Sequence, residues 1–92
     1  SNAPYIWNYE DSDLQFATNN TARMTIDNSG SVGVGTDSPG TKLHVYDAAS
    51  DITARVETGK TDGTAALELE NDAQTWQLST APDDKFVLKD VD

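Results

Sequence analysis

The feature that most constrains this chain is a set of short runs in which apolar and polar residues alternate. Because side chains on a strand point alternately to opposite faces, each run predicts a short strand with one buried and one solvated face. Turn-forming residues separate the runs, and no stretch keeps helical spacing for three turns, so the sequence predicts an all-β fold with at most a helical turn in 37–50. The alternating residues are Tyr5, Trp7 and Tyr9, Leu14 and Phe16, Met24 and Ile26, Val32 and Val34, Leu43 and Val45, Ile52, Ala54 and Val56, Leu67 and Leu69, Trp76 and Leu78, and Phe86 and Leu88.

The supply of large apolar side chains is small for a chain that folds alone. Ninety-two residues, 36% of them hydrophobic, allow one small domain or one or two units of a repeat. A chain of this length buries only about 60% of its unfolded surface. A small monomeric β-sandwich is one solution, and association of several copies around a shared core is the other. Association also covers exposed strand edges, so the sequence favours an oligomer.

Charge and cysteine content exclude several classes of function. Sixteen acidic against six basic residues give a net charge of −10, which argues against binding nucleic-acid phosphates or anionic membrane lipids. The chain has no cysteine, which excludes a disulfide framework and a thiolate zinc site. No apolar stretch approaches the roughly 18 residues that a membrane span requires. We therefore expect no nucleic-acid or membrane partner and no cofactor.

The residues that could support catalysis are few and scattered. His44 is the only histidine, which excludes a catalytic triad or a two-histidine metal site within one chain, and we expect it to face solvent or to hydrogen-bond between chains. Glu68 and Glu70 alternate with leucines, as on the solvated face of a strand, and do not indicate a glycosidase pair. The Asp-Ser-Asp segment 11–13 begins like a calcium loop but lacks its further acids and glycine. The sequence predicts no catalytic residue, no metal site and no enzyme activity.

Residues 23–46 carry the most specific pattern. They read Arg-Met-Thr-Ile-Asp, a glycine-containing turn, Val-Gly-Val-Gly-Thr, a Ser-Pro step and Lys-Leu-His-Val. This pattern resembles the repeat in the shafts of bacteriophage tail fibres and of related phage-like or bacterial surface proteins. Val34 stands where isoleucine is usual in that repeat, and Asp37 stands where threonine is frequent.

The rest of the chain is similar to the segment that precedes this pattern in such proteins. Trp76 lies ten residues before Phe86, and Trp7 lies nine residues before Phe16, which indicates a weak internal repeat. The chain therefore reads as one repeat cut out of phase from a longer protein.

The phase of the repeat sets the expected organisation. We interpret residues 4–47 as the back half of one repeat, with its Val-Gly-Val-Gly strand and linker, and residues 48–92 as the front half of the next. Residues 1–3 read as the remnant of a purification tag.

The resemblance implies an elongated, parallel homotrimer in which strands from three chains wind around one axis. It implies a structural role as shaft or connector in host attachment, in a virion tail fibre or on an extracellular surface. Gly33 and Gly35 would allow close packing at the axis, because glycine in a strand is otherwise costly, and the alternative is a bulge or turn in a monomer. The expected trimer core consists of Met24, Ile26, Val32, Val34, Leu43 and Val45.

Aromatic residues leave one alternative function open. Trp7 and Trp76 have the kind of side chain that stacks on sugar rings, so a carbohydrate-binding β-module of a fibre tip or adhesin is the second hypothesis. Both residues also fall at apolar positions of alternating runs, which favours a role in core packing.

Overall fold

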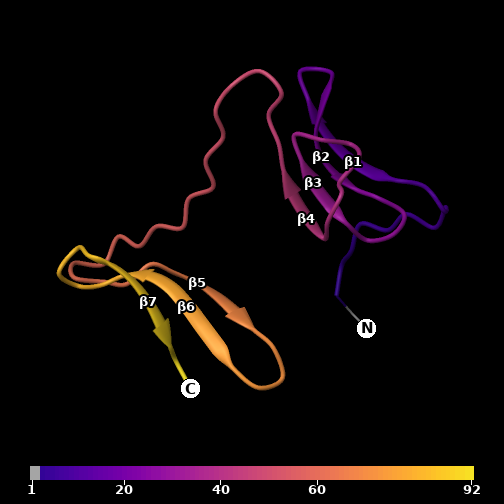
Figure 1. The fold of residues 1–92 in the computed structure, drawn as a ribbon. Helices are drawn as coiled ribbons and strands as arrows, with labels where there is room; N and C mark the ends of the chain where they lie inside the picture. Colours follow the sequence, from indigo (N-terminus) through magenta and orange to yellow (C-terminus); the bar gives the residue numbers. More distant parts are fainter. Residues whose placement is uncertain (1–2) are drawn as a thin grey trace. The chain divides into compact units, whose positions relative to one another are not determined.

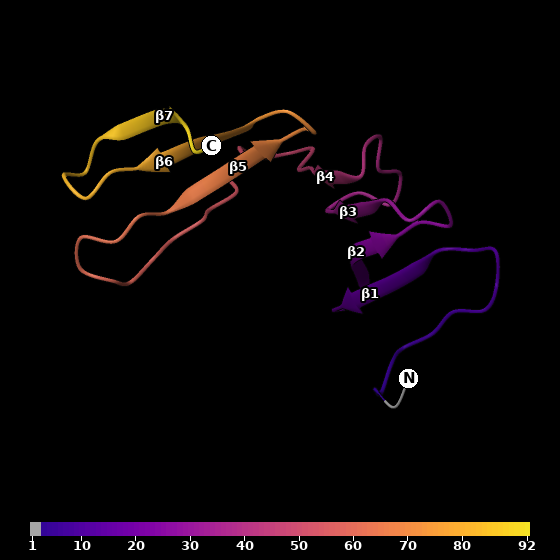
Figure 2. The ribbon, with the colours of Figure 1, turned by 90° about the horizontal axis from the view of Figure 1, so that it is seen from below.

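The computed structural model describes residues 3–92 and contains two β-sheets (Figure 1). The first sheet has the strand order β1–β2–β3–β4, with its strands side by side, and the second has the order β5–β6–β7 (Figure 2). The described residues contain no helix, so the predicted all-β class is confirmed, and the one helical turn that the sequence allows in 37–50 does not form. The strands are β1 (Leu14–Thr18), β2 (Thr21–Ile26), β3 (Val32–Val34), β4 (Leu43–Val45), β5 (Ala66–Glu70), β6 (Thr75–Thr80) and β7 (Phe86–Asp90).

The chain divides into two compact units, Ser1–Thr53 and Ala54–Asp92. The first unit contains the four-stranded sheet, and the second contains the three-stranded sheet. Residues 46–65 join β4 to β5 without forming a strand. The division of the sequence into repeat halves at 47/48 concerns the phase of the repeat and stays a prediction.

A tight hairpin joins β1 to β2. Asn19 and Asn20 between the strands have φ angles of 51° and 56°, and a two-residue type I′ turn requires positive φ at both positions. Asparagine adopts this region more readily than most residues with a side chain. The strands then pair antiparallel, with Phe16 opposite Met24, and the register shifts once directly after Phe16.

Polar side chains fix the next turn. The Asp27 carboxylate accepts hydrogen bonds from the backbone N–H groups of Ser29 at 3.0 Å and Ser31 at 2.9 Å. Gly30 completes the turn with a φ of 88°, a conformation that costs glycine little. The turn brings β3 antiparallel to β2, and the loop 35–42 then places β4 parallel to β3.

The second sheet is an antiparallel meander. At the turn between β5 and β6, the Asn71 side-chain oxygen accepts the N–H groups of Ala73 at 3.0 Å and Gln74 at 2.9 Å. At the turn between β6 and β7, Ala81 N–H donates to the Lys85 carbonyl at 2.7 Å. These contacts set which residues of adjacent strands face each other, and therefore which side chains share a face.

Two strands that alternation predicts are absent. Residues 5–9 and 52–56 alternate apolar and polar residues but belong to no strand. A strand satisfies its backbone N–H and C=O groups by pairing, and neither segment is paired into one of the two sheets.

The turn after β3 gives a test of this backbone path. Gly35 has a φ of 84°, and a methyl group there would collide with the Tyr46 carbonyl oxygen, whereas Gly59 has open space around it. We expect Gly35→Ala to break the β3–β4 pairing and to cost more than about 1 kcal/mol of stability, because both the conformation and the space are wrong. We expect Gly59→Ala to be neutral. Denaturant unfolding of the two variants measures the difference, and equal midpoints would contradict the loop path described here.

Candidate interaction surface

The most unusual property of this chain is that no hydrophobic side chain is buried among residues 3–92. The buried side chains in this range are polar, and they are Thr25, Thr75 and Ser79. Folded domains normally bury their apolar groups, because removing apolar area from water is the main favourable contribution to folding. The apolar surface that this chain leaves in solvent is therefore its candidate functional site.

The first apolar face is one side of the sheet β1–β4. Its side chains form two rows that cross all four strands at matching positions. The six residues predicted from the sequence as a core all lie on this face, so the structure brings them together, and their role between chains stays a prediction. One row is Leu14, Ile26, Val32 and Leu43, and the other is Phe16, Met24, Val34 and Val45.

Solvent reaches much of this face. Leu43 is 65% exposed, Phe16 41%, Val34 40% and Met24 36%. The sequence predicts strands with one buried face, and within the unit Ser1–Thr53 that expectation is not met. The reason is physical: period two specifies which side chains share a face, and a second layer is needed to cover them.

The opposite side of the same sheet is polar and better covered. Gln15, Thr25, Gly33 and His44 form a row across the four strands. The Gln15 amide donates to the Thr25 hydroxyl at 3.2 Å, and Thr25 is 1% exposed. Thr25 is thus buried and hydrogen-bonded on the polar side, whereas the apolar side stays open.

His44 is held by its own chain. Its Nδ1 accepts the Gly40 N–H at 3.1 Å, and its ring contacts Tyr46 edge-to-face at a centroid distance of 5.9 Å. The side chain is half-buried. The structure gives His44 a local role, which is to hold the loop that leads into β4, and a hydrogen bond between chains stays a prediction.

The second apolar face lies on the sheet β5–β7. Its exposed side chains include Phe86 at 74%, Leu88 at 62% and Trp76 at 46%. Six apolar side chains lie on this face, and they form one continuous surface because neighbouring strands pair in register. They are Leu67, Leu69, Trp76, Leu78, Phe86 and Leu88.

The other side of this sheet is again polar. Thr75 and Ser79 are buried there at 8% and 5% exposure, and the Gln77 amide donates to the Glu68 carboxylate at 3.1 Å. Glu68 and Glu70 lie on this polar side, as the alternation with leucine predicts.

Gly33 and Gly35 are both required by the backbone of this chain. A methyl group on Gly33 would collide with the Thr36 carbonyl oxygen, and one on Gly35 with the Tyr46 carbonyl oxygen. A close approach between chains at a trimer axis is therefore not needed to explain either glycine. The sequence could not show this, because the collisions depend on the path of the loop after β3.

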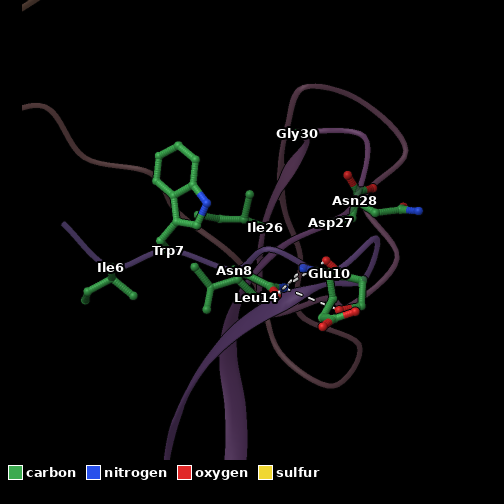
Figure 3. Close-up of a pocket in the computed structure, with 10 residues that line it drawn as sticks. Ile6, Trp7, Asn8, Glu10, Leu14, Ile26, Asp27, Asn28 and Gly30 are labelled. Carbon is green, nitrogen blue, oxygen red and sulfur yellow. Dashed lines mark hydrogen bonds between the residues drawn. The ribbon is translucent and has the colours of Figure 1, made fainter. Parts of the chain in front are cut away.

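Trp7 lies at one end of the first apolar face (Figure 3). With Ile6, Leu14 and Ile26, it supplies the apolar part of a groove of about 340 Å³. The other side of the groove is formed by polar residues of the turn 27–30 and of the segment 8–12. Trp7 thus extends the first apolar face beyond the edge of the sheet and is itself 63% exposed.

The calcium-like segment 11–13 holds a turn. The Asn28 side-chain amide donates to the Asp11 carboxylate at 2.9 Å, and the Asn28 backbone N–H donates to Asp13 at 3.3 Å. Within the described part of the chain, no three His, Cys, Asp or Glu side chains gather into a metal-binding group. These two carboxylates therefore fasten the N-terminal segment to the turn between β2 and β3.

An exposed row of aromatic rings precedes β1. The ring centroids of Tyr5 and Trp7 are 5.3 Å apart, and those of Trp7 and Tyr9 are 5.8 Å apart. Tyr5 and Tyr9 are 67% and 83% exposed. Trp76 differs, because it lies within β6 opposite Leu69 on the second apolar face. The structure thus separates the two tryptophans that the sequence groups as sugar-stacking candidates.

No protein-family model and no curated protein matches the chain. Residues 3–92 contain no helix with the length and apolarity needed to cross a membrane. The interpretation of the surface therefore depends on its geometry and on the pattern in residues 23–46.

The turn after β4 gives a pH-dependent test. The backbone N–H groups of Ala49 and Ser50 each donate to the Asp47 carboxylate at 2.9 Å and hold the pKa of Asp47 below its usual value of 3.8. A lowered pKa means that the carboxylate stabilises the turn above pH 3.8 and that this contribution is lost as the pH falls through the lower folded value. We expect the Ala49 and Ser50 amide resonances to shift only in that acid range. In Asp47→Asn, which cannot titrate, they should not shift, and titration of Asp47 at or above 3.8 would contradict this turn.

Proposed function

We propose that this chain is a structural segment of a homotrimeric, phage-type tail fibre, in which it serves as shaft or connector in host attachment. The observation that supports this most is the pair of apolar faces, one on each sheet, that solvent reaches. A second observation is the pattern of residues 23–46, which resembles the shaft repeat and runs from β2 to just beyond β4.

The energetics favour association. Full burial of a Val, Leu, Ile, Phe or Met side chain is worth about 1.5–3 kcal/mol relative to leaving it in water. The first apolar face presents eight such side chains, and a single chain leaves part of that free energy unused. Copies that meet through these faces gain that free energy.

The number of copies follows from the resemblance, because shaft repeats of this kind belong to parallel trimers. The proposed work of the segment is mechanical. It keeps three chains together and in register, and this task needs no catalytic residue and no cofactor.

The mass in solution tests the proposal. We expect light scattering coupled to size exclusion to give the mass of three chains, and we expect that mass to persist on dilution. Ile26→Asp should prevent assembly, because it places an unpaired charge in each of three equivalent apolar positions, at a cost of several kcal/mol.

Gln15→Asp is the matched control for this variant. Gln15 lies on the polar side of the same sheet, so its replacement loses one hydrogen bond of about 1 kcal/mol and should leave the trimer intact. A monomeric wild type with cooperative unfolding would refute the trimer. A stable Ile26→Asp trimer would show that the first apolar face is not the interface.

A second candidate function is supported by the aromatic row of Tyr5, Trp7 and Tyr9. These rings are exposed and lie along an extended segment outside both sheets, as a platform for sugar rings would. If the chain is a carbohydrate-binding module, a glycan array should show binding that Trp7→Ala abolishes without changing the circular dichroism. Trp76→Ala should leave that binding intact, because Trp76 lies in the other unit, on a sheet face. Wild-type protein that binds no glycan would exclude this candidate.

A further inference from the structure

β1 and β7 are outer strands that are each paired along one edge only. β1 is bordered by β2, and β7 is bordered by β6. We propose that the free edge of β7 docks a second copy of the segment 21–45, so that β7 and β1 are the same strand in successive repeats. This inference rests on the proposed repetitive fibre and goes beyond it by naming the strand edge that connects one repeat to the next.

The two strands match in length and pattern. Each has five residues, with large apolar side chains at the first and third positions. In β1 these are Leu14 and Phe16, and in β7 they are Phe86 and Leu88. Both pairs lie on the apolar face of their sheet, so the two strands are interchangeable in side-chain direction.

The backbone of β7 leaves the required groups free. Ala81 N–H donates to the Lys85 carbonyl at 2.7 Å, and Val91 N–H donates to the Thr75 carbonyl at 3.1 Å, so the odd-numbered residues of this segment point towards β6. Backbone groups of successive strand residues point to opposite edges. The N–H and C=O groups of the first, third and fifth residues of β7 therefore point to the free edge.

The backbone of β1 uses the same positions to bind β2. Asp27 N–H donates to the Ser31 carbonyl and Gly35 N–H to the Arg23 carbonyl, so the odd-numbered residues of β2 point towards β3. The even-numbered residues of β2 point towards β1, where they oppose the first and third residues of that strand. β1 thus pairs with β2 through the backbone groups of its first and third residues. The backbone groups at the same positions of β7 are unpaired, and in both strands the side chains of these residues lie on the apolar face.

A charge pair supports this occupant in particular. In the first sheet, Arg23 Nε donates to the Thr18 hydroxyl at 2.9 Å, and Thr18 is the fifth residue of β1. The fifth residue of β7 is Asp90. A β2 strand docked on β7 therefore places the Arg23 guanidinium opposite a carboxylate, and a charge-assisted hydrogen bond is stronger than the neutral one that it replaces.

The turn after β1 is the connection that a docked β2 needs. Asn19 and Asn20 have the positive φ angles of a type I′ turn, whereas neither Val91 nor Asp92 has a positive φ. The completed sheet has the strand order β5–β6–β7–β2–β3–β4, with the last three strands from the second copy. Its apolar residues lie on one face, which also carries Thr80 and Asp90.

The test joins residues 1–90 directly to residues 19–53, so that the Asn19–Asn20 turn follows β7 as it follows β1. Amide hydrogen exchange by NMR reads the edge of β7 one residue at a time. We expect the N–H groups of Phe86, Leu88 and Asp90 to exchange rapidly in the 92-residue chain and at least about tenfold more slowly in the extended one. The N–H groups of Val87 and Lys89 face β6 and should be protected in both.

Two controls test the register and the charge pair. One glycine inserted between Asp90 and the added segment shifts that segment by one residue and turns its apolar side chains to the wrong face, so the added protection should be lost. Asp90→Lys in the extended chain should lose it as well, by repulsion from Arg23, whereas Asp90→Thr restores the residue type of β1 and should keep it. Protection that survives the glycine insertion, or even-numbered amides that already exchange slowly in the 92-residue chain, would overturn the inference.

A parallel mass measurement separates this inference from the proposed function. A monomeric extended chain with protected even-numbered amides supports edge docking and refutes the trimer. A trimer whose even-numbered amides in β7 exchange rapidly after the extension supports the trimer and refutes edge docking.

Discussion

The structure depends on one feature, which is that each sheet has an apolar face that the rest of its own unit does not cover. Ordering a residue costs about 1–2 kcal/mol of backbone entropy, and burial of apolar area is the main contribution that offsets this cost. The strands of each sheet are paired and joined by turns within one unit, yet side chains such as Leu43 and Phe86 remain mostly in solvent. Folding and association are therefore linked in the proposed fibre, because the surface that stabilises the strands is also the interface between chains.

The polar residues decide where that interface lies. Asp27 and Asn71 close turns with their side-chain oxygens, and Asn19 with Asn20 sets the hairpin before β2. A shift of one residue in any of these turns would exchange the two faces of a strand. The short side chains at the turns thus specify which residues become apolar surface, although they contribute little burial themselves.

The sequence predicts the faces better than the partners. Period two correctly gathers Met24, Ile26 and Val34 with their neighbours on one side of the first sheet, because side-chain direction on a strand is a local property. It fails for residues 5–9 and 52–56, because alternation does not specify a pairing partner. The loop path that makes Gly35 necessary is equally non-local, since the carbonyl that a side chain would meet lies eleven residues away.

The apolar faces of the sheets and the free edge of β7 have different roles in the proposed assembly. Burial of the apolar faces holds separate chains together around an axis, and pairing between β7 and the next β2 would join successive repeats of one chain. A repeat that completes its sheet only with its neighbour cannot be stable alone, which is the general behaviour of repetitive proteins. The same arrangement removes the hazard of an open edge at β7, because the following unit occupies that edge, whereas β4 and β5 stay outer strands. The open apolar faces and the open edge of β7 then have one explanation. In the proposed assembly, a unit covers its apolar face and completes its sheet only together with its neighbours.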